Sequence, residues 1–147
     1  MAVRSKLWAL RAIASVAIAL AGCGGSVVDG TPQGANHGCI DDSKLCIEQR
    51  QASLKALQAD KTRGWIKQPA SVNSYVTGVR LFAFKTEKAR LNCDELGAGR
   101  READGAPSVL RSPQAAGINP ATVSRGLMFA AEVGKELDRE QQRRCRA

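Results

Sequence analysis

The chain has 147 residues, with 22 lysines and arginines against 14 aspartates and glutamates, a formal net charge of +8 and a pI near 9.7. This length fits one domain rather than two. Aromatic residues make up only 4% of the chain, which argues against an aromatic-rich β core and predicts a mainly α fold, a small helical bundle of about four helices.

The N-terminal segment has the composition of a secretory signal. Arg4, Lys6 and Arg11 are followed by an uncharged run over residues 12–21. A basic start, a short apolar stretch and small residues at its end are the three parts of such a signal. A membrane-spanning helix needs about 20 apolar residues, and this run is about half that length. We therefore expect no permanent span here.

The apolar run ends in Leu20-Ala21-Gly22-Cys23, which resembles the lipobox of bacterial lipoproteins. The resemblance implies that signal peptidase II removes residues 1–22. It also implies that Cys23 is the lipidation site, carrying a diacylglyceryl thioether and usually an N-acyl chain. Acyl chains hold a protein on a membrane because each buried CH₂ contributes about 0.8 kcal/mol.

The resemblance further implies a periplasm-facing protein anchored in the bacterial cell envelope. Some Gram-negative bacteria retain lipoproteins at the inner membrane when an aspartate follows the lipidated cysteine. Here position 24 is glycine, which favours the outer membrane. Residues 23–39 are rich in glycine and include the only histidine, His37, so we expect a flexible tether followed by a helical domain over residues 40–147.

Five cysteines are an odd number for a secreted chain, and lipidation of Cys23 leaves an even set: Cys39, Cys46, Cys93 and Cys145. In an oxidising compartment this set predicts two disulfides, for which three connectivities exist. On one helix, Cys39 and Cys46 would lie about 10 Å apart, beyond the limit of about 7 Å for bridged Cα atoms. A local bridge requires Cys39 to fold back from the preceding loop. We therefore favour pairing Cys46 with Cys93 and Cys39 with Cys145.

The first helices follow from apolar spacing and capping residues. A helix is predicted from Asp41 or Asp42 as N-cap to about Ala59, with Cys46 facing inward. Residues 60–70 read as a connector whose Trp65 and Ile66 pack against the core. Ser71 is a credible N-cap for a second helix, continuing past Gly78, although β propensity leaves a strand open for residues 76–84. Its expected inward positions are Val72, Tyr75, Val76, Val79, Phe82 and Ala83.

Two further helices complete the predicted bundle. A half-exposed helix is expected over residues 86–103 and ended by Gly105, with a short turn around Val109 and Leu110 and a loop over residues 112–118. Asn119-Pro120 is a strong helix start, because it combines a capping side chain with proline at the first helical position. The final helix is expected to run to about Arg144. Its predicted inward stripe is Val123, Leu127, Ala130, Val133 or Gly134, and Leu137.

Positive charge gathers at the C-terminus, in Arg139, Arg143, Arg144 and Arg146. There it complements the negative end of the helix dipole, and the simplest interpretation is a stabilised, solvated helix end. The functional interpretation is an anion-binding site. In the periplasm the available anions are lipid A phosphates, anionic phospholipids and cell-wall polymers, so we expect no nucleic-acid partner.

No sequence pattern predicts catalysis. No serine lies in a G-x-S-x-G or S-x-x-K context, and the cysteine spacings match neither zinc nor haem or redox motifs. The acidic pairs, such as Glu132 and Glu136, are typical of caps and polar helix faces. We expect no cofactor and no metal. The favoured hypothesis is an envelope lipoprotein acting as a binding or structural module, whose partners are the membrane and an envelope protein or anionic polymer. The alternative is a small cell-wall or lipid-modifying enzyme.

Overall fold

The computed structural model describes residues 39–145. The predictions made for the signal peptide, for Cys23, for His37 and for Arg146 lie outside these residues. The described part contains five α-helices and three short 3₁₀ turns and no strand, so the mainly α prediction is confirmed. The helices are α1 Lys44–Ala59, α2 Val72–Thr77, α3 Val79–Glu87, α4 Cys93–Leu110 and α5 Pro120–Arg144.

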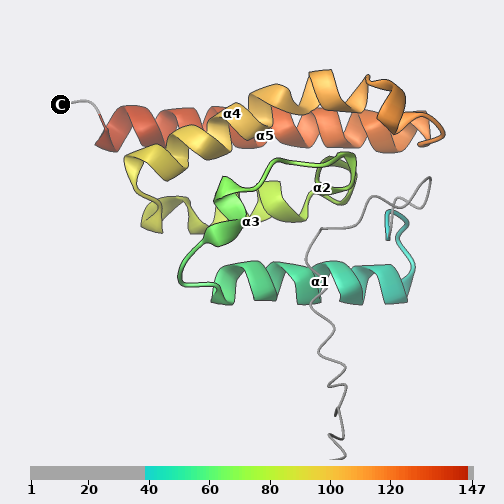
Figure 1. The fold of residues 1–147 in the computed structure, drawn as a ribbon, viewed down its shortest axis with the longest axis horizontal. Coiled ribbons are helices and arrows are strands. Elements are labelled where there is room, and N and C mark those ends of the chain that lie inside the picture. Colours follow the sequence, from blue (N-terminus) through green and yellow to red (C-terminus); the bar gives the residue numbers. More distant parts are fainter. Residues whose placement is uncertain (1–38, 146–147) are drawn as a thin grey trace, which may run out of the picture.

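The helices form three layers (Figure 1). The long helices α4 and α5 run antiparallel side by side, α2 and α3 lie beneath them, and α1 covers the opposite side of α3. Helix α5 is about 37 Å long at 1.5 Å per residue. None of the helices within residues 39–145 is both long enough and apolar enough to cross a membrane.

Side-chain hydrogen bonds of capping residues fix where α1 and α5 begin. Helix α1 begins after Ser43, whose Oγ accepts the Cys46 N–H at 3.3 Å. The prediction of Asp41 or Asp42 as the cap was therefore wrong; Asp41 lies just outside the helix and accepts the Ser43 N–H at 2.9 Å. Helix α5 begins as predicted after Asn119, whose Oδ1 accepts the Ala121 N–H at 2.8 Å, and it ends as predicted at Arg144.

The predicted second helix is in fact two helices. A capping box between Ser71 and Ser74 opens α2 as expected, but Gly78 adopts a left-handed conformation with φ of 69° and ends it. Helix α3 then starts with a new rotational phase. As a result Phe84 is fully buried, whereas Phe82, expected inside, is 42% exposed.

The prediction for residues 86–110 was wrong at both ends of the helix. A 3₁₀ turn, Lys88–Arg90, breaks the chain after α3, and a capping box between Asn92 and Glu95 starts α4. Helix α4 continues through Gly105 and Pro107 to Leu110. Its last turns persist because Ala106 and Leu110 are buried in the core, which outweighs the local helix-breaking tendency.

The core lies between α3, α4 and α5. Its centre is Phe84, and a Cβ atom at Gly99 of α4 would lie only 2.5 Å from the Phe84 ring. Trp65 packs edge-on against Phe84 with ring centroids 4.7 Å apart, as the connector prediction required, and Ile66 packs partly buried beside it. The largest fully buried side chains are Phe84, Leu81, Leu91, Leu96, Leu137 and Val133.

A buried ion pair crosses this interior. The side chains of Arg80 and Glu102 are only 5% and 7% exposed, and the guanidinium binds both carboxylate oxygens, at 3.1 and 2.6 Å. Arg80 also donates to the carbonyl of Gln68 at 2.9 Å. The hydroxyl of Tyr75 donates to the Glu102 carbonyl at 2.8 Å. Burial, followed by the Glu102 charge, raises the pKa of Tyr75 to about 12. These bonds join the 68–69 connector, α2, α3 and α4.

Candidate functional site

The four cysteines predicted to form disulfides do so, but with a different connectivity. Cys39 pairs with Cys46, and Cys93 pairs with Cys145, so the favoured pairing was wrong. Cys39 lies before α1 and folds back, which brings its Cα atom to 4.7 Å from that of Cys46. The separation of about 10 Å applied only to two positions within one helix.

Arg50 keeps the segment before α1 folded back. Its guanidinium donates to the Asp41 carbonyl at 2.6 Å and to the Cys39 carbonyl at 3.2 Å, and it approaches the Asp42 carboxylate at 3.4 Å. The Ser43 hydroxyl and amide hydrogen bonds lower the pKa of Asp41 below its ordinary value. Together with the disulfide, these contacts fix residues 39–42 beside α1.

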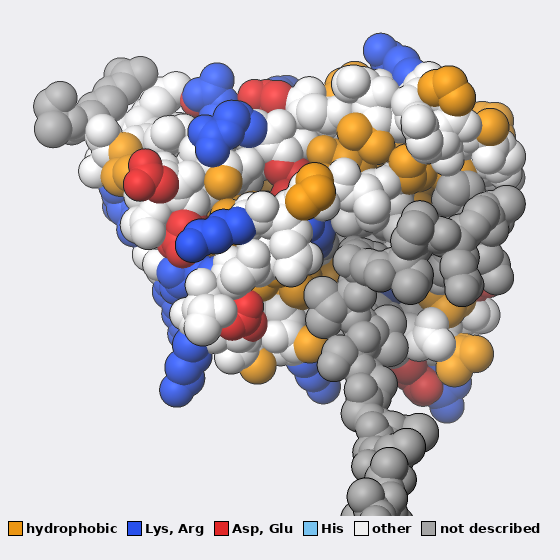
Figure 2. All heavy atoms as spheres, in the orientation of Figure 1, with side chains coloured by type: hydrophobic (Ala, Val, Ile, Leu, Met, Phe, Trp, Pro, Cys, Tyr) orange, Lys and Arg blue, Asp and Glu red, His pale blue; other side chains and the backbone are white. Residues whose placement is uncertain are grey.

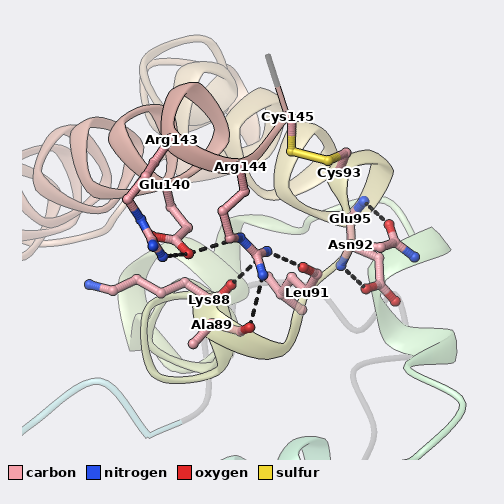
Figure 3. Close-up of a disulfide and its surroundings, with 10 residues drawn as sticks. All are labelled: Lys88, Ala89, Leu91, Asn92, Cys93, Glu95, Glu140, Arg143, Arg144 and Cys145. Carbon is pink, nitrogen blue, oxygen red and sulfur yellow. Dashed lines mark hydrogen bonds and ion pairs between the residues drawn. A yellow bond between two sulfur atoms is a disulfide. The ribbon is translucent and has the colours of Figure 1, made fainter. Parts of the chain in front are cut away.

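The other disulfide joins the start of α4 to the end of α5, where the predicted basic cluster lies (Figure 3). Arg144 turns towards the α3–α4 connection and donates to the carbonyls of Ala89, at 3.0 Å, and Leu91. It also forms an ion pair with Glu140 at 2.9 Å, which Arg143 shares at 2.5 Å. Arg144 therefore links the end of α5 to the connection between α3 and α4.

Arg139 and Arg143 line a small polar hollow of about 290 Å³ with Lys88, Glu136 and Glu140. Hydrogen bonds from Lys88 and Lys85 lower the pKa of Glu136, and the hydrogen bond from Arg143 lowers that of Glu140. Figure 2 shows lysines and arginines beside aspartates and glutamates at this end of the molecule. The described arginines thus lie among carboxylates, and anion binding by this cluster stays a prediction.

A larger groove lies between α1, α2, α3 and α5. Its volume is about 360 Å³, and most of its lining is apolar. Two phenylalanines from different helices, Phe82 and Phe129, stack in it with ring centroids 6.3 Å apart. The other apolar side chains of the lining are Ile40, Ile47, Leu54, Val76 and Val79.

Three charged residues lie at the edge of the groove: Asp42, Arg50 and Arg125. Arg125 of α5 contacts the Asp42 carboxylate at 3.3 Å, and the two side chains are 56% and 72% exposed. Its other hydrogen bond, to the Thr122 hydroxyl, is 3.5 Å long. Arg50, by contrast, is held by the carbonyls of residues 39 and 41. Arg125 is therefore the cation that can exchange its partner.

Sequence reasoning did not identify this groove. The 3.6-residue spacing predicts Phe82 in the core only if one helix continues through Gly78 without a break. The break at Gly78 rotates the following residues relative to α2. Arg125 and Phe129 stand four residues apart on α5, a spacing that places both on one helix face, but nothing local shows what that face meets. The signal available was Gly78 itself, whose position inside a helical pattern favours a break.

The groove offers binding contacts rather than a recognisable set of reacting groups. The described lining contains one carboxylate, Asp42, and no group of three or more potential metal ligands occurs among residues 39–145. No known protein family, curated protein or solved structure matches this chain. The functional interpretation therefore depends on the sequence and structure of this chain alone.

Proposed function

We propose that this chain is a bacterial cell-envelope lipoprotein, anchored through Cys23, whose helical domain binds a ligand in the groove between α1, α2, α3 and α5. The groove is the observation that carries the binding role. Ile47 and Phe82 leave large apolar surfaces open to solvent there. Concave apolar surfaces with a few polar groups at the edge are the usual form of ligand sites.

The disulfides support the anchor. All four cysteines of the described residues are paired with one another, so none of them is available as a partner for Cys23. An even set of paired cysteines suits an oxidising compartment. Lipidation of Cys23 accounts for the fifth cysteine, and the lipobox resemblance of residues 20–23 gives it a chemical role. A periplasm-facing location, with the outer membrane favoured, is part of the same proposal.

The mass of the protein extracted from envelopes of a bacterial host tests the anchor. We expect a chain that begins at Cys23, carries acyl chains, and exposes four alkylatable thiols only after reduction. The Cys23→Ala variant should carry no acyl chains and should keep residues 1–22, because the lipidated cysteine directs their removal. A full-length species with free thiols would contradict the anchor and the compartment together.

Crosslinking in intact envelopes tests the binding role separately. We expect wild-type protein to recover a ligand or partner through the groove, and Phe82→Asp to lose it. Met128→Asp is the control, because Met128 of α5 is also an exposed large apolar side chain, 67% exposed against 42% for Phe82, and does not line the groove. Recovery that is unchanged in Phe82→Asp would refute the groove as the binding site.

A further inference from the structure

We propose that the groove binds a single-chain anionic amphiphile, a long-chain fatty acid, with its carboxylate at Arg125 and its hydrocarbon chain against Phe82 and Phe129. This inference deepens the proposed function, since it names the ligand class of the same groove. It is argued from the volume, the lining and the edge charges of that groove.

The lining suits a hydrocarbon chain. Phe82 of α3 and Phe129 of α5 form one stacked surface, and Ile47 and Leu54 of α1 line the groove with them. Burial of apolar surface contributes about 25 cal/mol per Å², or roughly 0.8 kcal/mol for each CH₂. An unbranched chain can therefore gain affinity along the whole lining without any directional contact.

The size of the groove favours a small ligand over a protein partner. Its volume of about 360 Å³ lies at the lower end of the range of roughly 300–1,000 Å³ that is usual for small-molecule sites. A stable protein interface buries at least about 1,000 Å² and needs a much larger matched surface. A groove of this volume can hold a single acyl chain.

The edge charges favour an acidic head group. Arg50 and Arg125 against Asp42 give the edge a formal excess of one positive charge. The contact between Arg125 and Asp42 is long and exposed, and such ion pairs contribute only about 0–1 kcal/mol. A ligand carboxylate can displace Asp42 at small cost, and it gains a bidentate geometry that is well suited to a guanidinium.

Isothermal titration of the full chain carrying Cys23→Ala tests the inference, because this variant has no acyl chains of its own to compete. The probes are dodecanoate, dodecyltrimethylammonium, dodecyl phosphate and acetate, with the amphiphiles below their micellar concentrations. We expect dodecanoate to bind at least tenfold more tightly than the cationic amphiphile, and acetate not to bind. Equal binding of the two amphiphiles, or no binding of dodecanoate, would overturn the proposal. Tighter binding of dodecyl phosphate than of dodecanoate would overturn the assignment to a carboxylate.

Two matched pairs of variants locate the site. Arg125→Gln should weaken dodecanoate binding about tenfold and remove the preference over the cation, whereas Arg111→Gln, outside the groove, should leave both unchanged. Phe82→Asp should abolish binding, whereas Met128→Asp should not. Equal effects within either pair would overturn the assignment to the groove. Circular dichroism of each variant verifies that the helices remain folded.

Deletion of residues 24–37 tests whether another part of the same chain competes for the groove. If deletion of these residues is required before dodecanoate binds, the groove belongs to that segment and the proposal fails. Affinity that is unchanged by the deletion supports it. These titrations are independent of the mass measurement on Cys23, so failure of the ligand class and failure of the lipid anchor are distinguishable.

Discussion

Helix α1 and the bundle formed by α2 to α5 are built differently. Along the 16 residues of α1 only Cys46 is buried, and Leu54 and Leu57 are partly covered by the core. Helix α5 buries Ala130, Val133 and Leu137 among others, and α4 is its most extensive neighbour. The groove lies where these two regions meet, because α1 covers the bundle incompletely.

The two disulfides also differ between α1 and the bundle. Cys93–Cys145 joins positions 52 residues apart and links the start of α4 to the end of α5, which lie at the same end of this antiparallel pair. Cys39–Cys46 spans seven residues and fixes only the segment that enters α1. One bridge therefore constrains the α4–α5 pair, and the other shapes an edge of the groove, where Ile40 and Asp42 lie.

The largest expected effect concerns the interior of the bundle. Arg80→Met should lower the free energy of unfolding by about 3–5 kcal/mol, because it leaves the Glu102 carboxylate buried without its cation. Urea denaturation measures this change. Arg125→Met is the control, since it removes an exposed ion pair, and it should cost less than about 1 kcal/mol. Equal losses of unfolding free energy in the two variants would show that the buried Arg80–Glu102 pair stabilises the fold no more than the exposed Arg125–Asp42 pair.

The disulfides give the next largest effect. By loop-closure entropy, replacing Cys93 and Cys145 with serine should cost about 4 kcal/mol, and replacing Cys39 and Cys46 about 2 kcal/mol. Thermal melts of the two double variants compare them. Hydrogen exchange should show faster opening throughout α4 and α5 in the first variant, and only around residues 39–50 in the second. Global destabilisation by the second variant would show that α1 is as integral as α5.

A smaller effect should follow from crowding between α3 and α4. Gly99→Ala places a methyl group 2.5 Å from the Phe84 ring and 2.9 Å from Leu137, and overpacking of this kind costs about 1–3 kcal/mol. Gly97→Ala is the control, because its new methyl group would meet only the flexible ends of Arg101 at 3.3 Å and Gln141 at 3.5 Å. Chemical denaturation of both variants measures the difference. A Gly99→Ala protein as stable as Gly97→Ala would contradict the tight packing.

The smallest expected effect is electrostatic. The pKa of Glu136 is lowered in the folded protein by Lys88 and Lys85, so this carboxylate stabilises the fold above its ordinary pKa of 4.5. That contribution is lost as pH falls through the lowered folded value. Glu136→Gln should therefore cost up to about 1 kcal/mol at pH 7.

The same variant should approach wild-type stability as the pH falls below 4.5, the ordinary carboxyl value. Denaturation midpoints measured between pH 3 and pH 7 follow this convergence. Glu48→Gln is the matched control, since Glu48 makes only an exposed contact of 4.0 Å with Lys44, and it should show almost no change. A Glu136→Gln deficit that is independent of pH would indicate a packing effect instead.

Local signals correctly predicted the starts of α2 and α5, whereas the capping box of Asn92 and Glu95 at the start of α4 was missed. Ser71, Asn119 and Pro120 marked helix starts that the structure confirms, because their side chains satisfy backbone N–H groups without help from the rest of the chain. Trp65 was correctly placed against the core. The helix that spans Gly105 and Pro107 was missed, because long-range burial of Ala106 and Leu110 decides it.

The amino-acid sequence by itself determined the helical class, the end of α1, the start of α2, both ends of α5 and the even set of cysteines within the folded domain, since these depend on periodicity, caps and composition. It also provides the lipobox resemblance at Cys23, on which the proposed location depends. Only the tertiary structure decided which cysteines pair, where Phe82 points and that Arg125 meets Asp42 at a groove. Those features join residues from different helices, and their distances depend on how the helices pack rather than on the order of the chain.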